Sequence, residues 1–571
     1  LYDKDSEGDR MNSSRFQRHN IRSPFSGLMA HGEPWVWLMS GSLAVAVVMI
    51  VGLLLFITVR GSLHFWPRPL YEITLRDGET FLGEEISREG HMNSYQADDT
   101  LTDRRLVHTA NFELTGAHYR WIEEDDIVTT RRPKFATVVE RLDGGRFHGF
   151  PACVLKNGIA MSNSPKAAWR KYMEIAPTVR RQFLDANYID RHERGKLQQR
   201  LRNARLATFD ASIRHGTEAH SILQATREKE EQISKEVAVL SSSLDSKLAS
   251  LRKATQEWDF EFKTTEGLSI ILPVEEIVQA WQPNNLGFFG SFRIYGARWW
   301  EFLSDDPREA NSAGGVFPAI CGTVSMTFFM ALLVAPLGVL AALYLREYAT
   351  DGPITATVRI AINNLAGVPS IVYGAFGLGF FCYGIGGGID ELFFNASLLA
   401  DNQPTYGTGG LLWASLTLAL LTLPVVIIAT EEALVAVPNS MREGSYACGA
   451  SKWQTIYRIV LPRALPGIMT GLILAMARAA GEVAPLMLVG VKKVALDLPF
   501  DTSFPYFHPE REFMNLAYLV YDVGFQSPNS QAAKPVVFTI TLLLVVLIAT
   551  LNITAIYIRS HLKRRYAPQH F

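Results

Sequence analysis

An arginine and a glutamate stand in a stretch of the chain that is otherwise apolar. Arg478 and Glu482 lie four residues apart within the segment 466–489, so on a helix they share a face and can pair. A lone charge at the centre of a membrane helix costs about 2.5–3.5 kcal/mol, which makes such residues functional candidates. A planar guanidinium suits a pair of anion oxygens. We therefore predict that Arg478 lies on an anion path with Glu482 as its partner or gate; the alternative is a structural ion pair.

The loop 431–465 carries two helix-start signals, each a serine with Glu or Gln three residues later: Ser440 with Glu443, and Ser451 with Gln454. Gly449 stands between these signals and suits the left-handed conformation that ends a helix. Pro462 is expected to close the second helix before the next apolar stretch. The sequence therefore predicts a helix, a glycine turn and a second helix.

Six stretches of the chain are long and apolar enough to cross a bilayer as helices, which needs about 20 residues. Of the 571 residues, 48% are hydrophobic and 19% are charged, against about 25% charged in soluble domains. These values exclude a wholly soluble protein and predict a polytopic α-helical membrane protein. The predicted spans are 35–59, 317–345, 361–383, 411–430, 466–489 and 535–558.

Lysines and arginines in the short flanks indicate how these spans are oriented. Both ends of the chain are basic: the segment 1–34 before the first span, and the residues that follow the last span, up to the tail 566–571. Both termini are therefore expected in the cytoplasm. The loop 385–410 has no Lys or Arg and is expected outside, whereas the basic loop 431–465 is expected in the cytoplasm. Met11 is a candidate for the true start of translation.

The polar block 60–310 between the first two spans is expected outside the membrane. Its first part, about 70–157, alternates apolar and polar residues between turn signals, which predicts a β-rich domain. The next part, about 167–258, predicts a helical hairpin or short coiled coil with an apolar seam at Val237, Leu240, Leu244, Leu248 and Leu251. We interpret the block either as an arm that contacts a partner or as a rigid spacer.

No metal site is predicted in this block. Four of its histidines lack ligand spacing on any one element: His91, His108, His118 and His148. The four cysteines of the chain are widely scattered and contain no CxxC pair, so neither a zinc site nor a disulfide framework is predicted.

The loop 431–465 resembles the coupling loop of ABC importer permeases. In that motif a glutamate and two small residues are followed at fixed spacings by Gly, Ile and Leu-Pro; here they are Glu443, Gly444, Ser445, Gly449, Ile459, Leu461 and Pro462. Gly444 and Ser445 stand where the family has two alanines. The resemblance implies that the loop docks into a separate ATPase. The chain itself has no GxxxxGK[ST] loop for ATP phosphates.

Two further segments, 366–374 and 476–486, resemble the phosphate ABC transporter permeases of the PstA type, in a long form with a large periplasmic insertion. The resemblance implies six transmembrane helices of the MetI-like type, with an α+β insertion between helices 1 and 2. The permease domain would be 311–565. It also implies that inorganic phosphate is the anion of the Arg478 and Glu482 path.

Proline and glycine within the spans are expected to loosen helices where a pathway opens: Pro336, Pro369 and Gly374. Both residue types also occur in membrane helices for packing reasons, and this alternative stays open for each position.

The resemblance implies a permease subunit of an ATP-driven importer in a bacterial inner (plasma) membrane. Its partners would be the lipid bilayer, a homologous second permease, an ABC ATPase dimer and a periplasmic phosphate-binding protein. No cofactor and no catalytic residues are expected in this chain, so it is not predicted to be an enzyme. A net charge of −1 gives no indication of nucleic acid. Two alternatives are a permease for molybdate or sulfate, and a membrane-anchored periplasmic sensor or docking protein; a sensor would need a signalling domain where only short loops follow.

Overall fold

The computed structural model describes residues 33–92, 101–112, 116–162, 164–215, 220–308, 311, 313–501, 506–527 and 530–566. Met11 and nearly all of the predicted terminal segments 1–34 and 566–571 lie outside these residues. The chain forms two compact units, 1–59 and 60–571. The first unit contains most of the apolar helix α2 (Glu33–Ser62), whose side chains are largely exposed.

Six helical segments within the described residues are long and apolar enough to cross a membrane: Trp35–Phe65, Phe317–Tyr348, Ser370–Phe393, Leu411–Val435, Lys452–Ala480 and Ala533–His561. Four of them begin within two residues of the predicted spans. The third begins at Ser370 instead of residue 361, because Gly367 and Pro369 separate α9 (Pro353–Leu365) from α10 (Ser370–Phe376). The fifth begins and ends earlier than predicted.

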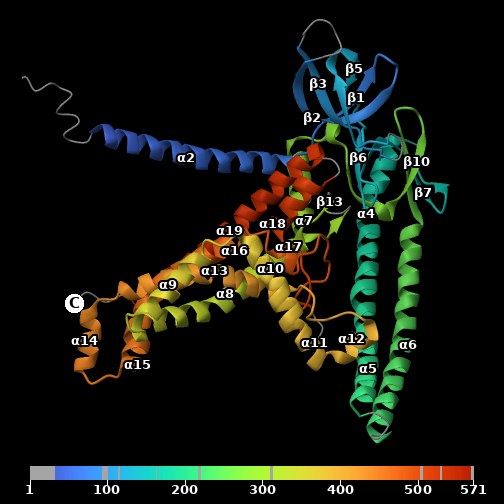
Figure 1. Ribbon diagram of the computed structural model, residues 1–571. Coiled ribbons are helices and arrows are strands. Elements are labelled where there is room, and N and C mark those ends of the chain that lie inside the picture. Colours follow the sequence, from blue (N-terminus) through green and yellow to red (C-terminus); the bar gives the residue numbers. More distant parts are fainter. Residues whose placement is uncertain are drawn as a thin grey trace, which may run out of the picture. The chain divides into compact units, whose positions relative to one another are not determined.

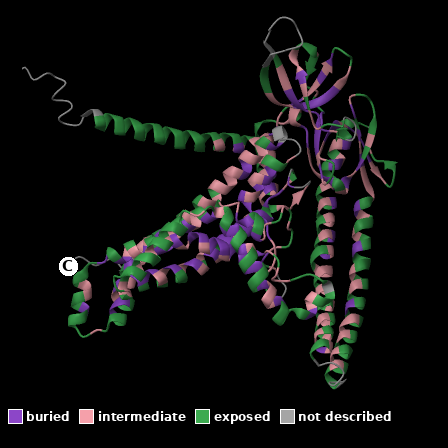
Figure 2. Ribbon diagram, in the orientation of Figure 1, coloured by how far each residue is buried: buried purple, intermediate pink, exposed green. Residues whose placement is uncertain are grey.

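Three helices form the core of the bundle: α8 (Phe317–Leu343), α13 (Leu411–Val435) and α16 (Leu461–Ala480). Buried side chains from all three meet there, including Met330, Leu418 and Ala475. A Cβ added to Gly338 of α8 would lie 2.6 Å from the Val426 side chain of α13, so the glycine permits close helix packing. Figure 2 shows that the buried residues concentrate where these helices meet.

The outer part of the second unit contains two antiparallel sheets (Figure 1). The five-stranded sheet has the order β4-β3-β2-β1-β5, and the larger sheet has the order β10-β9-β7-β6-β11 with β8 paired to β7. The strands are β1 (Leu70–Leu75), β2 (Thr80–Met92), β3 (Leu101–His108), β4 (Tyr119–Glu123), β5 (Ile127–Arg131), β6 (Thr137–Arg141), β7 (Arg146–Lys156), β8 (Ile159–Ala160), β9 (Trp258–Lys263), β10 (Ser269–Pro273) and β11 (Ile277–Trp281). The predicted β-rich insertion is therefore present.

Three long helices separate β8 from β9: α4 (Pro165–Tyr188), α5 (Arg194–His215) and α6 (His220–Gln256). α5 and α6 form the predicted helical hairpin (Figure 1). Of the predicted seam, Val237 and Leu248 are buried, whereas Leu240 is exposed. After the hairpin the chain returns to the sheets, because β9 pairs with β7 and β11 pairs with β6.

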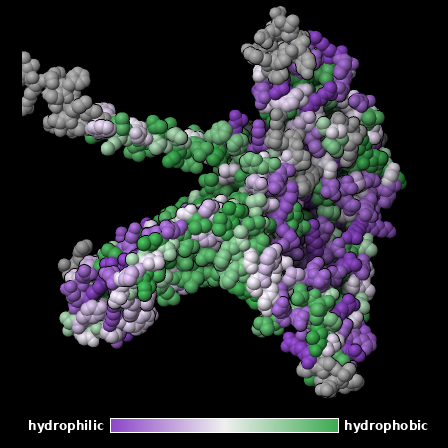
Figure 3. All heavy atoms as spheres, viewed as in Figure 1, coloured by the Kyte–Doolittle hydropathy of each residue, from purple (hydrophilic) through white to green (hydrophobic). Residues whose placement is uncertain are grey.

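The remaining elements connect the sheets to the bundle or complete the spans. They are the 3-10 turns Leu63–Phe65, Glu124–Asp126, Val274–Glu276 and Pro283–Asn285, the π-helical segments Ile189–Glu193, Tyr344–Tyr348, Gly377–Gly386, Ile456–Val460 and Asp522–Gln526, the strands β12 (Pro307–Arg308) and β13 (Ala313–Gly314), and the helices α7 (Phe288–Ser304), α11 (Gly387–Phe393), α12 (Asn395–Asp401), α14 (Asn439–Ala447), α15 (Lys452–Thr455), α17 (Leu486–Val489), α18 (Leu516–Tyr521) and α19 (Ser530–Tyr566). Figure 3 shows hydrophobic surface over the bundle helices and mainly hydrophilic surface over the sheets.

Candidate functional site

The loop after α13 folds as two short helices, α14 and α15, on either side of a glycine turn. Gly449 has a φ of +81°, which favours glycine. The Ser451 hydroxyl accepts a hydrogen bond from the Gln454 backbone N–H at 3.3 Å, and the Gln454 side chain accepts one from the Ser451 N–H at 2.9 Å. This is the predicted capping box of the second helix. The predicted helix–turn–helix arrangement is confirmed.

The prediction that Ser440 caps the first helix is wrong. The N-cap of α14 is Pro438, and no side chain caps this helix. Pro438 has a ψ of 138°, so the chain is extended there and turns into the helix at Asn439. Ser440 is therefore the second residue of the helix and does not occupy the N-cap position, from which its hydroxyl would accept from the N–H groups of the first turn.

The prediction that Pro462 closes the second helix is also wrong. The helical segment that begins at Lys452 continues to Ala480. Pro462 lies in the first turn of α16, directly after the π-helical turn Ile456–Val460. We attribute its tolerance to this change of hydrogen-bond register, because a proline has no N–H to donate.

The motif residues at the start of the loop differ in exposure. Glu443 and Gly444 are exposed, and a Cβ on Gly444 would meet no described atom within 4 Å. Ser445 is buried, and its hydroxyl lies 2.8 Å from the Thr455 hydroxyl, which links α14 to α15. Packing within the described chain therefore accounts for a small residue at position 445 but not at 444.

Exposed aromatic rings continue the surface around Gly444. Tyr446 is 43% exposed, and Trp453 and Tyr457 of the second helix are 59% and 61% exposed with their rings stacked. We call the exposed residues of this patch the loop surface: Glu443, Gly444, Tyr446, Trp453 and Tyr457. Such a patch of large exposed rings is typical of an interaction site.

Arg442 fixes the loop to the bundle, a role that the sequence analysis missed. Its guanidinium lies 3.1 Å from the Glu347 carboxylate at the end of the second span. It also donates hydrogen bonds to the carbonyl oxygens of Leu434 and Val437, at the end of α13. An arginine at a helix C-terminus stabilises unpaired carbonyls. The loop is therefore tied to the ends of two spans, and in Figure 1 it lies at the opposite end of the bundle from α18.

The predicted pair of Arg478 and Glu482 is present. The Arg478 Nε lies 3.5 Å from a Glu482 carboxylate oxygen, and the Arg478 side chain is 41% exposed. Arg478 lies in the last turn of α16, since that helix ends at Ala480.

The packing of α16 against α13 gives the depth of Arg478 in the bundle. A Cβ on Gly467 would lie 2.5 Å from the Ala433 Cβ, and one on Gly471 would lie 2.5 Å from the Ala429 Cβ. The two helices are therefore antiparallel. Continued along the helices, this register brings Arg478 level with about Thr422, near the middle of α13.

The fifth helical segment ends at Ala480, at this depth, and we call the non-helical residues 481–485 that follow it the interruption. Residues 481–485 are not helical, and a short helix, α17, follows them. A Cβ on Gly374 of α10 would lie 2.7 Å from the Pro485 Cα, so the glycine lets α10 approach the interruption. The structure therefore supports packing, the alternative to helix flexibility, as the reason for a glycine at position 374.

The two prolines of the predicted flexibility set occupy different environments. Pro336 lies inside α8, where it lines a groove of about 580 Å³ together with Leu461 and Pro462 of the coupling motif. Ile459, two residues before Leu461, is half-buried. Pro369 is the N-cap of α10 and marks the break between α9 and α10.

Comparisons with known proteins place these features in a context. Residues 334–568 match the family described as "Binding-protein-dependent transport system inner membrane component". This range includes the loop, Arg478 and the interruption of the fifth span, whereas the two sheets and the helical hairpin lie before it.

Individual relatives carry related names. The chain is 36% identical over 279 residues to "Phosphate transport system permease protein PstA 1" of Mycobacterium tuberculosis (strain CDC 1551 / Oshkosh), which covers 48% of this chain and 81% of the relative. It is 36% identical over 218 residues to "Probable ABC transporter permease protein YqgH" of Bacillus subtilis (strain 168), covering 37% of this chain and 65% of the relative. A solved structure titled "Inward facing conformations of the MetNI methionine ABC transporter: CY5 native crystal form" aligns with 47% of this chain and 98% of its own, at 19% identity and a TM-score of 0.31.

Proposed function

We propose that the chain is the permease subunit of an ATP-driven importer of inorganic phosphate. The premise is its family: the chain belongs to the binding-protein-dependent transport permeases, and among them to the PstA phosphate permeases. The observation that carries the proposal is the position of Arg478. A half-exposed guanidinium at the middle of a membrane bundle, beside an interrupted helix, offers donors to an oxyanion away from bulk water.

In this proposal Arg478 binds phosphate oxygens during passage, and Glu482 holds the guanidinium between passages. The arginine is always charged, and its five donors in a planar fork match two oxygens of one phosphate. The Arg478–Glu482 contact is long, at 3.5 Å, so an incoming anion competes with a weak partner. Arg478 lies in the last turn of α16 and Glu482 just past its end, and each passage requires only side-chain rotation.

The loop surface would dock into a separate ATPase. Glu443 and Gly444 are exposed. Because Gly444 has no side chain, it leaves room for the backbone of a partner to approach closely. The contacts of Arg442 with Glu347 and with the end of α13 would transmit movement of the loop to two spans. ATP hydrolysis belongs to the ATPase in this scheme, so the permease has no catalytic residues and needs no cofactor.

The assembled importer would contain this chain, a homologous second permease, an ATPase dimer and a periplasmic phosphate-binding protein. We place it in a bacterial inner membrane with both termini and the loop surface in the cytoplasm and the two sheets in the periplasm. The sheets and the loop surface lie at opposite ends of α8, since Val316 at its start lines a cavity with sheet residues and Glu347, just past its end, contacts Arg442. This agrees with a chain that crosses the membrane between them.

The proposal is tested by transport in vesicles that contain the purified complex and internal ATP. We expect uptake of labelled phosphate that depends on ATP and on the binding protein, and that excess molybdate or sulfate does not inhibit. Stronger inhibition by molybdate or sulfate than by unlabelled phosphate would reassign the substrate to another oxyanion. ATP-independent uptake would contradict the coupling to an ATPase.

A further inference from the structure

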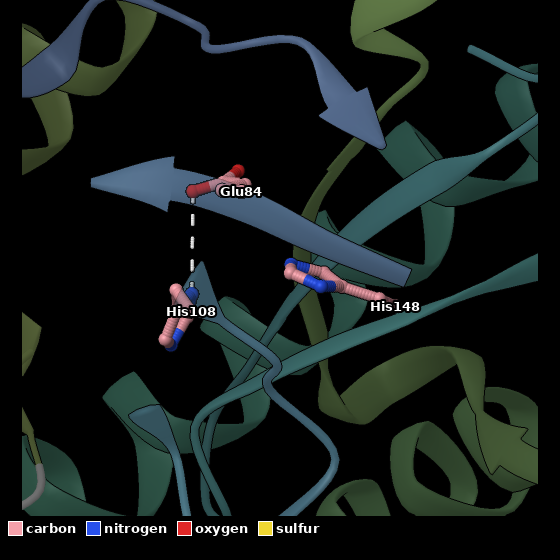
Figure 4. A group of neighbouring side chains, drawn as sticks. All are labelled: Glu84, His108 and His148. Carbon is pink, nitrogen blue, oxygen red and sulfur yellow. Dashed lines mark ion pairs between the residues drawn. The ribbon is translucent and has the colours of Figure 1, made fainter. Parts of the chain in front are cut away.

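Three side chains with metal-binding atoms meet between the two sheets, far from Arg478 in the sequence. Glu84 of β2 and His108 of β3 are direct cross-strand partners, and His148 comes from β7 of the other sheet. One ligand atom from each lies within 4.8 Å of the others. Figure 4 shows the carboxylate and the two imidazoles around one space. The three side chains are almost completely buried, at 3%, 6% and 1% exposed.

Three of the four imidazole nitrogens are poorly satisfied within the described chain. His108 Nδ1 and both ring nitrogens of His148 are buried and make no hydrogen bond of normal geometry, and the Leu82 backbone is the acceptor that acts on His148. The Glu84 carboxylate lies 4.0 Å from His108 Nδ1, which is too far for a hydrogen bond. Buried polar groups in folded proteins are nearly always satisfied, so several orphan nitrogens around one space indicate a missing ligand.

Burial is the main influence on the pKa of both histidines. Burial lowers the pKa of His148 to about 4, with Arg146 acting in the same direction and Glu84 and the Leu82 carbonyl opposing it. Burial, followed by the nearby His148 and Arg146, holds the pKa of His108 well below its ordinary range.

The charges around the cluster indicate which class of metal ion it could bind. Arg146 lies 3.1 Å from the Glu84 carboxylate, but it also contacts Glu140 at 2.9 Å and so has a carboxylate of its own. Arg68 contributes a further positive charge close by. Hard cations such as Mg²⁺ and Ca²⁺ depend on negative charge and oxygen ligands, which this environment does not favour. Imidazole ligands favour zinc and its neighbours in the first transition row.

We propose that Glu84, His108 and His148 bind one transition-metal ion of the zinc type, which joins the two sheets. Two histidines and one glutamate form a known zinc ligand set that leaves a fourth position for water. Glu84 and His108 line a cavity of about 640 Å³, which gives a metal ion access and leaves room for that water. His148 does not line the cavity and would close the site from the other sheet. The proposal concerns the insertion alone and does not depend on the transported substrate.

The test is zinc binding by the full-length chain, purified in detergent without a histidine tag. After treatment with a chelator, one equivalent of Zn²⁺ is added and the protein is passed through a desalting column. We expect one zinc per chain and a higher midpoint of thermal unfolding than in the metal-free protein. His148→Gln and His108→Gln should each weaken zinc binding at least about tenfold, because each removes one of three ligands.

His118→Gln is the matched control. His118 lines the same cavity, but it stacks on Phe112 and does not belong to the ligand group. This variant should bind zinc like the original chain. Equal zinc binding by the His148 and His118 variants, or no zinc retained by the original chain, would overturn the proposal.

A spectroscopic measurement keeps the test valid if the ligand variants do not fold. Co²⁺ in place of Zn²⁺ should give the visible absorption of a four-coordinate ion in the original chain and in His118→Gln. An absorption spectrum identical to that of Co²⁺ in buffer would refute the site without any ligand variant.

Discussion

Arg478 separates two mechanisms at the scale of a single residue. If it contacts the transported anion, Arg478→Ala should reduce phosphate uptake roughly 10- to 100-fold, the loss of one or two hydrogen bonds to a charged group. Membrane insertion and association with the ATPase should not change, since Arg478 is half-exposed and distant from the loop surface in the sequence. Arg478→Lys should restore little uptake, because an ammonium cannot offer the planar fork. The measurement is uptake of labelled phosphate per inserted protein.

The double variant Arg478→Ala with Glu482→Ala is the control for this prediction. If the pair only neutralises charge within the membrane, removing both charges leaves no unpaired ion, and transport should recover. Recovery would contradict the pathway role. Uptake as low as in the single variant would support it.

Sequence reasoning reached this pair because its spacing is local. Two residues only four apart stay close even though α16 ends at Ala480, between them. The partners of Arg442 and the cluster of Glu84, His108 and His148 depend instead on segments that meet only after folding. A search of one element at a time therefore could not find a group of side chains that two sheets bring together.

At the scale of elements, the turn between α14 and α15 depends on Gly449. Its φ of +81° is accessible to glycine and strained for a β-branched residue, by about 1–3 kcal/mol. Gly449→Val should therefore change the angle between α14 and α15, with loss of ATPase co-purification and of uptake, while the spans stay inserted. Gly158→Val is the control, because Gly158 has a φ of +77° and the same strain but lies in the turn between β7 and β8, outside the loop. Normal ATPase binding and uptake in Gly449→Val would contradict the coupling role.

The third span offers two glycines in different environments. A Cβ on Gly374 would lie 2.7 Å from the Pro485 backbone at the interruption of the fifth span, whereas one on Gly379 would meet nothing within 4 Å among the described residues. Gly374→Ala should lower stability by about 1–3 kcal/mol through overpacking, and Gly379→Ala should not. Thermal unfolding of the two purified variants measures the difference. Equal midpoints would show that the interruption moves aside at little cost.

Helix boundaries show where local signals are sufficient and where they are not. The Ser451–Gln454 capping box formed as predicted because both of its hydrogen bonds lie within one turn. The equivalent signal at Ser440 did not form a cap, because the fixed backbone of Pro438 set the start of α14. Pro462 did not end its helix because a π-helical turn precedes it, a feature that has no simple sequence signature.

At the scale of the whole molecule, composition predicted the β-rich and helical parts of the insertion but not their connection. The chain leaves the larger sheet after β8 and returns to it after α6, and β11 pairs with β6 across the intervening helices. Pairing between strands so far apart leaves no local pattern. Removing residues 68–263 as one block would therefore leave β10 and β11 without their partner strands, β9 and β6.

The structure indicates a cleaner way to test the insertion, by shortening the hairpin of α5 and α6. Ala186, Ile189 and Leu248 pack together at its base, so residues 194–243 can be replaced by a flexible linker above that cluster. Packed helix axes lie about 8–10 Å apart, a distance that about four to six linker residues span easily. The shortened chain loses the contact of α5 with α12 (Asn395–Asp401), but the sheets and the core of the bundle keep their contacts. We therefore expect normal ATP hydrolysis and normal uptake at saturating phosphate. Uptake is then measured over a range of phosphate concentrations, which separates the two interpretations of the insertion. A spacer predicts unchanged uptake at every concentration. An arm that receives the binding protein predicts a defect only at low phosphate. Loss of the folded complex would contradict both, since it would make the hairpin part of the core.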